Sequence, residues 1–184
     1  MKKTITLTLA LLGIHFSSYS QAYDGYYDLK IFLGYVNVGG NSGIEYQNDF
    51  GVNDLFSWGT QATYLISTKV DNDGVGYEKG FKFLDSFDGG GFVRFHFREA
   101  LNLRENVDTY LGADFTVRSL GAHAGFKYNI SNVIGFYAMY KQSFAPLLKG
   151  DISLSEDRNG EPIESFFAKK AALSVGVTFN LNRK

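Results

Sequence analysis

Apolar and polar side chains alternate along most of this chain, and this alternation restricts its fold more than any other feature. Between residues 119 and 130, every even-numbered side chain is apolar or aromatic and every odd-numbered one is polar or glycine. A period of two residues is that of a β-strand with two unlike faces. Eight segments carry the pattern: Tyr26–Val36, Gly43–Phe50, Leu55–Ser67, Phe87–Arg98, Val107–Val117, Ser119–Ile130, Val133–Phe144 and Lys170–Leu181. The sequence therefore predicts an all-β fold.

The lengths of the segments and of their connections predict how the strands are arranged. Most segments have about ten residues, the length of a tilted strand that crosses a bilayer. The links Gly51–Asp54, Glu99–Asn106 and Ser131–Asn132 are short or moderate, whereas Thr68–Ser86 and Ala145–Lys169 are long and polar. Outer-membrane barrels have short periplasmic turns and longer exterior loops. The links after the first and fifth strands are short as well, but the pattern favours an eight-stranded antiparallel up-and-down transmembrane β-barrel over residues 23–184.

The N-terminus has the layout of a secretory signal peptide. Lys2 and Lys3 precede an apolar run from Ile5 to Ile14, and the small-x-small triplet Ser20-Gln21-Ala22 follows. The apolar run is about half the roughly 20 residues that a membrane-spanning helix needs. We therefore expect residues 1–22 to be removed on export, so that the mature chain starts at Tyr23. The chain has no cysteine, which excludes disulfides, cysteine metal sites and lipoprotein processing.

The composition of the two strand faces indicates which face points outward. A soluble lipocalin-like barrel also alternates, but with its apolar face inward and long charged residues outside. Here the polar face is rich in glycine, which suits a crowded lumen, and aromatic residues on the apolar face lie near the strand ends. The expected aromatic girdle consists of Tyr27, Tyr35, Trp58, Tyr64, Phe97, Phe115, Tyr128, Tyr140 and Phe179. We therefore expect the apolar face to contact lipid.

Charged residues of both signs lie on the polar face. The expected lumen network consists of Lys30, Asp49, Arg94, His96, Asp108, Asp114, His123, Lys127 and Lys141. A first turn near Gly39 and Gly40 places Lys30 opposite Asp49, and a turn near Arg118 places Asp114 level with His123. Because charges removed from water must be paired, a lumen filled by salt bridges is the main prediction. A narrow gated polar path is the alternative.

Several kinds of function find little support in the sequence. Only His96 and His123 remain after export, both expected in the wall without a nearby nucleophile, so we expect neither catalytic residues nor a metal site. No motif for a cofactor is present. Removing Lys2 and Lys3 leaves 16 basic residues against 19 acidic ones, which disfavours binding to nucleic acid.

The stretches FSWGTQATYLIS, SLGAHAGFKYNIS, GFYAMYKQS and LSVGVTFNLN resemble the small outer-membrane β-barrel proteins of Bacteroidota and, more remotely, the OmpA/OmpX-type eight-stranded barrels. The resemblance covers nearly all of the mature chain and is one of pattern. It implies general secretion and insertion by the outer-membrane assembly machinery, which recognises a terminal strand such as Lys170–Leu181. Many such barrels end on an aromatic residue, whereas Phe179 here precedes Leu181 and a basic tail.

Together these features predict a non-enzymatic protein of the outer membrane. Its role is expected to be structural, or to be binding of an extracellular or surface partner through the exterior loops, since loops on rigid scaffolds carry binding. Two alternatives stay open: a soluble periplasmic lipocalin-like barrel that binds a small apolar ligand, and a narrow channel or membrane-embedded enzyme.

Overall fold

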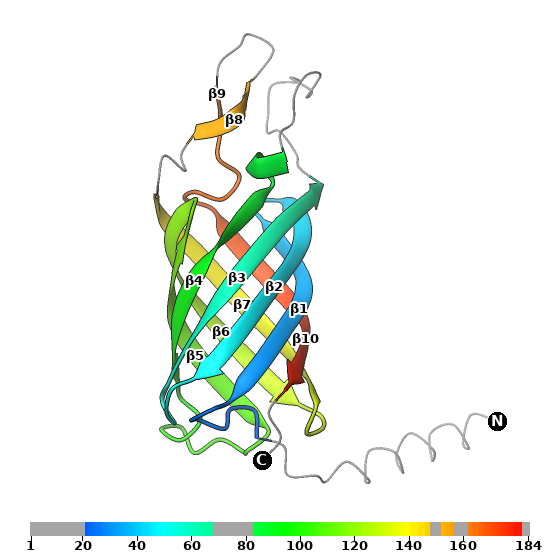
Figure 1. Cartoon of the computed structure of the whole chain (residues 1–184), viewed down its shortest axis with the longest axis vertical. Helices are drawn as coiled ribbons and strands as arrows, with labels where there is room; N and C mark the ends of the chain where they lie inside the picture. Colours follow the sequence, from blue (N-terminus) through cyan, green and yellow to red (C-terminus); the bar gives the residue numbers. More distant parts are fainter. Residues whose placement is uncertain (1–20, 68–82, 148–151, 157–161, 182–184) are drawn as a thin grey trace, which may run out of the picture.

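Eight antiparallel strands close into a single barrel in the computed structural model, which describes residues 21–67, 83–147, 152–156 and 162–181 (Figure 1). The barrel strands are β1 (Leu29–Val38), β2 (Asn41–Gly51), β3 (Phe56–Ser67), β4 (Phe87–His96), β5 (Val107–Thr116), β6 (Ser119–Asn129), β7 (Ile134–Pro146) and β10 (Ala171–Asn180). Each strand pairs with its neighbours along the chain, and β1 pairs with β10 from Lys30↔Asn180 to Val38↔Ala172. The predicted all-β, eight-stranded antiparallel barrel is confirmed.

The two ends of the barrel differ. The described chain begins and ends at one end, at Gln21 and Leu181, and this end, called the terminal end below, also holds the β2–β3, β4–β5 and β6–β7 turns. At the other end, called the loop end, β1 and β2 are joined by Gly39 and Gly40, whose φ angles of +55° and +91° suit a two-residue hairpin turn. The register shifts at Ser42/Gly43 and Leu120/Gly121 also lie at this end.

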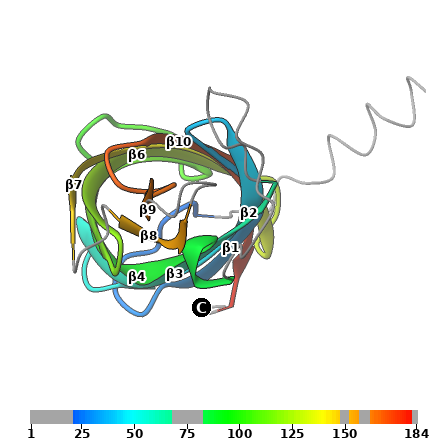
Figure 2. The ribbon, with the colours of Figure 1, turned by 90° about the horizontal axis from the view of Figure 1, so that it is seen from above.

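Two elements at the loop end interrupt stretches that the sequence predicted to be loops. A single 3₁₀ turn, η1 (Phe83–Asp85), precedes β4, and β8 (Ile152–Glu156) pairs with β9 (Pro162–Glu164) in a separate hairpin. The hairpin rises beyond the barrel rim (Figure 1) and lies within the outline of the barrel when seen along its axis (Figure 2). The alternation of apolar and polar residues did not predict this hairpin, because its strands have only 5 and 3 residues. Among the described residues, no helix is long and apolar enough to cross a membrane.

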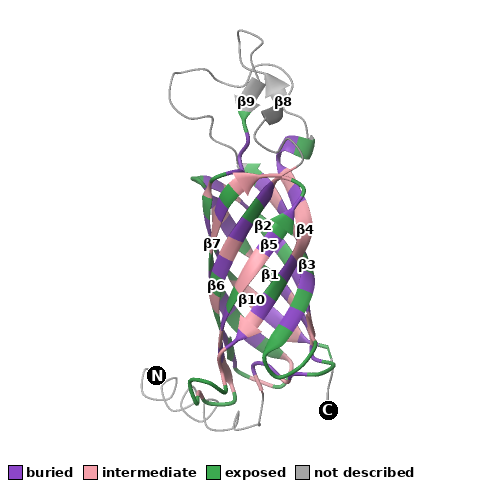
Figure 3. Cartoon of the chain, turned by 90° about the vertical axis from the view of Figure 1, so that its left-hand side faces the viewer, coloured by how far each residue is buried: buried purple, intermediate pink, exposed green. Residues whose placement is uncertain are grey.

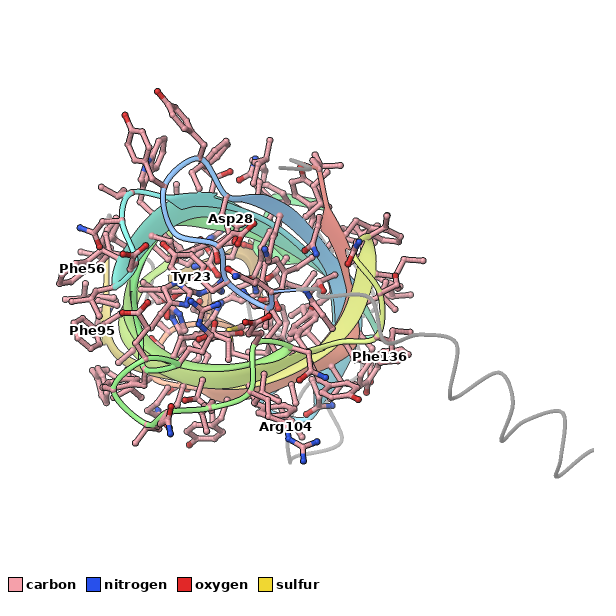
Figure 4. All side chains as sticks on the ribbon, turned by 90° about the horizontal axis from the view of Figure 1, so that it is seen from below. Tyr23, Asp28, Phe56, Phe95, Arg104 and Phe136 are labelled. Carbon is pink, nitrogen blue, oxygen red and sulfur yellow. The ribbon has the colours of Figure 1, made fainter. Side chains whose placement is uncertain are left out.

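The first strand begins three residues later than predicted, at Leu29. Gly25 and Tyr27 have φ angles of +73° and +67°, which lie outside the β region. Residues 21–28 instead turn across the mouth of the barrel at the terminal end, and this segment is called the strap below. Figure 4 shows Tyr23 and Asp28 inside the ring of strands, whereas Phe56, Phe95 and Phe136 point away from it.

Buried and exposed residues alternate along the barrel strands (Figure 3). The exposed large apolar side chains of these strands are Leu33, Tyr35, Ile44, Tyr46, Phe56, Trp58, Ile66, Val93, Leu111, Phe115, Leu120, Phe126, Tyr128, Ile134, Phe136, Tyr140, Phe144, Leu173 and Val175. The buried charged ones include Lys30, Glu45, Asp49, Asp88, Arg94, Asp108, Asp114 and Lys127. This facing is the reverse of a water-soluble barrel, whose apolar face is turned inward.

Glycines leave room in the lumen for large rings. A Cβ added at Gly125 would lie 2.2 Å from the Tyr110 ring, and one added at Gly34 would lie 2.3 Å from the Tyr137 hydroxyl. Tyr110 and Tyr137 pack with Phe32 and Met139 in the middle of the barrel. The glycines of the polar face therefore give up side-chain volume to their lumen neighbours, as the crowded-lumen interpretation expected.

Candidate functional site: the closed polar lumen

The lumen holds two groups of polar side chains, and Arg94 lies between them. The terminal cluster lies near the terminal end and consists of Asp28, Lys30, Ser57, His96, Asp108 and Lys127. The loop-side cluster lies in the other half and consists of Glu45, Gln61, Asp114, His123 and Lys141. Strand parity explains the grouping, since each of these residues except Asp28, which belongs to the strap, occupies an inward position of its strand.

In the terminal cluster, His96 lies between an acid and a hydroxyl. Its Nδ1 is 2.8 Å from Asp108 Oδ2 and its Nε2 is 2.8 Å from Ser57 Oγ. All three side chains are at least 98% buried. Lys127 Nζ is 3.5 Å from the same Asp108 oxygen, and Lys30 Nζ donates to Asp28 at 2.6 Å. This is the hydrogen-bond order of a Ser-His-Asp triad, within a charge-balanced cluster.

Tyr23 of the strap covers the terminal cluster. Its ring stacks on the His96 imidazole, with centroids 3.5 Å apart and planes inclined by 5°. Its hydroxyl lies within hydrogen-bond distance of the Asn53 and Phe56 carbonyl oxygens, at 2.7 and 2.6 Å. Burial, reinforced by the carboxylates of Asp49, Asp28 and Asp108, raises the pKa of Tyr23 far above its ordinary value. The ring therefore lies across the mouth in its neutral form.

Arg94 lies between the two clusters, on the inner face of β4, and bonds to His123 of the loop-side cluster. Its Nη1 donates to Asp49 Oδ2 at 2.9 Å, its Nε donates to His123 Nε2 at 3.0 Å, and its Nη2 donates to Gln47. The guanidinium also lies over the rings of Phe92, Tyr110 and Phe32, at 4.0, 4.4 and 5.0 Å from their centroids. Such contacts stabilise a desolvated cation. The Arg94 side chain therefore occupies space in the lumen, and its positive charge is compensated there.

The loop-side cluster is a continuous chain of hydrogen bonds. His123 Nδ1 lies 2.8 Å from Asp114 Oδ2, and Gln61 Nε2 donates to Asp114 Oδ1 at 2.9 Å. Lys141 Nζ donates to Gln61 Oε1 at 2.6 Å and to Glu45 Oε1 at 3.3 Å. The chain links β2, β3, β5, β6 and β7, so it cross-braces the wall.

The loop end is closed by apolar residues. Phe166 and Phe167 pack on Val36, Val38, Leu65 and Ala172 inside the rim. The Ser165 hydroxyl accepts from the backbone N–H of Phe167 and of Ala168, at 3.2 and 3.3 Å, which holds the turn. A cavity of about 20 Å³ lies beside Phe167 and Lys141, room for about one water molecule. With Tyr23 at the terminal end, both mouths are covered.

The predicted lumen residues all face inward, and the structure shows which of them form ion pairs. Lys30 lies opposite Asp49 in the β1–β2 register, yet Lys30 pairs with Asp28 while Asp49 pairs with Arg94. Asp114 is two positions from the direct partner of His123, and the two side chains meet diagonally. The predicted position of Lys30 opposite Asp49 is therefore confirmed, while the two side chains form their ion pairs with Asp28 and Arg94.

The residues of the expected girdle are exposed or half-buried and none is buried. Eight of them lie on the outer face of strands or directly beyond a strand end, whereas Tyr27 is 66% exposed within the strap. Sequence reasoning missed Ser57 as a partner of His96. Two signals were available: Ser57 shares the polar face of its strand with Gly59 and Gln61, and it lies at the start of the third strand. These signals do not show that Ser57 lies beside His96, because that follows from the β3–β4 register.

Among the described residues, no group of three or more histidine, aspartate or glutamate side chains could hold a metal ion. Residues 13–181 match a family described as "Family of unknown function (DUF6646)". The chain belongs to this family. No curated protein matches the sequence, and no solved structure matches it either. The match covers every barrel strand, so the lumen described above lies entirely within the family's shared region.

Proposed function

We propose that this DUF6646 protein is an integral outer-membrane β-barrel without enzymatic activity, whose role is structural or is binding at the cell surface through its exterior loops. The main support for the proposal is the orientation of the side chains in the barrel wall. Large apolar side chains cover the outside of a closed barrel, and charged side chains fill its inside. Only a closed barrel satisfies the backbone of β-strands in lipid. Signal-directed export and insertion by the outer-membrane assembly machinery belong to the same proposal.

Energetics support the membrane location. Burying a Val, Leu or Phe side chain is worth about 1.5–3 kcal/mol, and a wall of such side chains left in water would contribute none of this stabilisation. In hydrocarbon the same wall is favourable. The barrel strands have 10 to 13 residues, which suits a tilted crossing.

The lumen supports a structural or loop-mediated role over transport. Phe32, Arg94 and Tyr110 are each buried in the middle of the barrel, and the mouths are covered by Tyr23 and by Phe166 with Phe167. Eight strands enclose an interior just wide enough for side chains. The surface that remains for a partner is the loop end, with the β8–β9 hairpin projecting from it.

Arginine substitutions in the middle of the outer wall test the proposal. Ala124 and Val175 are exposed and lie near the centres of β6 and β10. Arginine at either position should cost about 2–4 kcal/mol in urea unfolding from lipid vesicles. Leu101→Arg is the control, because Leu101 is 58% exposed in the β4–β5 turn and should change stability by less than about 0.5 kcal/mol. Equal effects at all three positions would contradict the membrane-facing wall.

Localisation provides a second test. The full chain, expressed in a bacterium with an outer membrane, should fractionate with that membrane, need detergent for extraction and show heat-modifiable gel mobility. Release by osmotic shock without detergent would instead support a soluble periplasmic barrel.

An acyl-transfer enzyme with Ser57 as nucleophile is the second candidate, favoured by the 2.8 Å distances from His96 to Ser57 and Asp108. A fluorophosphonate probe tests it, since such probes bond to serines activated by histidine. An adduct on Ser57 that disappears in His96→Asn would support catalysis. The structural proposal expects no adduct in the wild type or in Tyr23→Ala, with heat-modifiable mobility retained in both.

A further inference from the structure

The first two residues of the strap are built into the barrel. The Ala22 N–H donates to the Glu105 carbonyl oxygen at 2.7 Å, and Asn129 Nδ2 donates to the Gln21 carbonyl oxygen at 2.8 Å. Arg98 Nη1 donates to Gln21 Oε1 at 3.2 Å and to the Tyr23 carbonyl oxygen at 2.7 Å. Ala22 is fully buried and Gln21 is half-buried. Gln21 and Ala22 therefore connect the strap to the ends of β4, β5 and β6.

The rest of the strap also makes close contacts with the barrel. The Gly51 N–H donates to the Asp28 carbonyl oxygen at 2.7 Å, and the Tyr27 N–H donates to the Gly51 carbonyl oxygen at 3.3 Å. A Cβ added at Gly51 would lie only 1.8 Å from the Gly25 carbonyl oxygen. The end of β2 thus accommodates the strap because residue 51 has no side chain, which indicates that the docked strap belongs to the folded state.

Two bonds in this region satisfy the small-x-small rule for signal removal. Ser20-Gln21-Ala22 places the cut before Tyr23, as the sequence analysis expected, and Ser18-Tyr19-Ser20 places it before Gln21. The rule alone does not choose between them. The contacts of the strap favour the cut before Gln21, because Gln21 and Ala22 are hydrogen-bonded into the folded barrel and so belong to the chain that folds.

A cut before Tyr23 would remove the groups that hold the strap to Glu105 and Asn129, and one of the two acceptors of Arg98. A cut before Gln21 keeps every one of these hydrogen bonds.

We propose that the signal peptide is cleaved between Ser20 and Gln21, so that the N-terminal segment of the mature chain covers the Ser57–His96–Asp108 group. The substrate of this processing step is the exported precursor itself. Water hydrolyses the peptide bond after Ser20: its oxygen becomes part of the new Ser20 carboxylate, and its hydrogen goes to the new Gln21 amine. The inference rests on the proposed export, and it changes the expected signal peptide from residues 1–22 to residues 1–20.

N-terminal sequencing and intact mass of the protein extracted from the outer membrane test the inference. The expected mature chain begins at Gln21. A membrane-located chain that begins at Tyr23 would overturn this inference and leave the proposed function standing. An uncut chain outside the membrane would overturn both, so the two failures are distinguishable.

Two substitutions separate the cleavage bonds independently of folding, because processing acts on the exported precursor. Ser18→Leu changes the position that must be small for a cut before Gln21 and is remote from the other bond. Ala22→Leu changes the residue directly before the Tyr23 bond. We expect Ser18→Leu to abolish the Gln21 N-terminus in the total envelope fraction and Ala22→Leu to retain it. The reverse pattern would overturn the assignment.

Discussion

The lumen contains two histidine–aspartate pairs that have the same geometry but different hydrogen-bond partners around them. In both, Nδ1 lies 2.8 Å from a carboxylate oxygen, of Asp108 for His96 and of Asp114 for His123. The other ring nitrogen of His123 faces Arg94, which can only donate, so His123 must accept there. The corresponding nitrogen of His96 faces the Ser57 hydroxyl, which can donate or accept.

The difference separates a locked imidazole from an adaptable one. His123 is fixed as the neutral tautomer that carries its proton on Nδ1, because a proton on Nε2 would point at a donor. At His96 the Asp108 carboxylate, which can only accept, likewise requires a proton on Nδ1, but the Ser57 hydroxyl places no such restriction on Nε2, and the Tyr23 ring stacks on this imidazole. One pair is therefore stabilised by the wall itself, and the other depends on the strap. Four measurements sharpen this contrast.

The largest effect is expected for Arg94→Met. The substitution leaves Asp49 buried without its cation and leaves His123 without its donor. Breaking a buried pair by removing one partner costs about 3–5 kcal/mol, which urea unfolding in detergent should measure. Arg104→Met, on an exposed residue of the β4–β5 turn, is the control and should stay within about 0.5 kcal/mol. A loss below about 1 kcal/mol at Arg94 would mean that it does not hold the two halves together.

The two histidines should respond unequally to replacement by leucine. His123→Leu deprives both Asp114 and Arg94 of a partner, so we expect a loss of about 2–3 kcal/mol. His96→Leu should cost about 1–2 kcal/mol, because Asp108 keeps Lys127 nearby. The comparison is made in urea under identical conditions. Equal or inverted losses would remove the distinction between the locked and the adaptable pair.

Ser57→Ala should have a smaller effect of about 1 kcal/mol, the usual worth of one neutral hydrogen bond. The His96–Asp108 contact lies on the other side of the ring and should persist. Unfolding in urea gives the magnitude, and Thr60→Ala on the outer face of the same strand provides the control for the loss of a hydroxyl that does not face the lumen. A loss as large as that of His96→Leu would show that Ser57 is essential to hold the ring.

The smallest effect concerns Tyr23 at alkaline pH. Its folded-state pKa is raised above the unfolded value of 10.0, so its contribution is fully present below that value and is lost as the pH rises above it. At pH 10.5 the wild type should therefore lose about 0.8 kcal/mol more than Tyr23→Phe, relative to pH 8, in urea unfolding. Identical alkaline losses in the two proteins would indicate that Tyr23 ionises freely and does not cover the mouth.

Much of the fold could be predicted because it depends on strictly local patterns. The alternation from Leu120 to Ile130 fixed both the strand and the face that its residues occupy, and Gly39 with Gly40 fixed the first turn. Elements without such a pattern were missed: the short β8–β9 hairpin, and the strap, whose course depends on positive φ angles at Gly25 and Tyr27. Both lie at the mouths of the barrel, where the chain leaves the repeating geometry of the wall.

The amino-acid sequence by itself determined the number of barrel strands and their antiparallel order, through the period of two and the length of the links, and the inward position of the charged residues, through the glycine-rich composition of the polar face. Only the tertiary structure decided which charges meet. Side chains such as those of Arg94 and Lys30 are long and flexible, so their partners depend on strand tilt, on diagonal contacts across the lumen and on the space that glycines leave. The partnership of Ser57 with His96 under Tyr23 arises from three segments that are distant in sequence, and no local pattern encodes it.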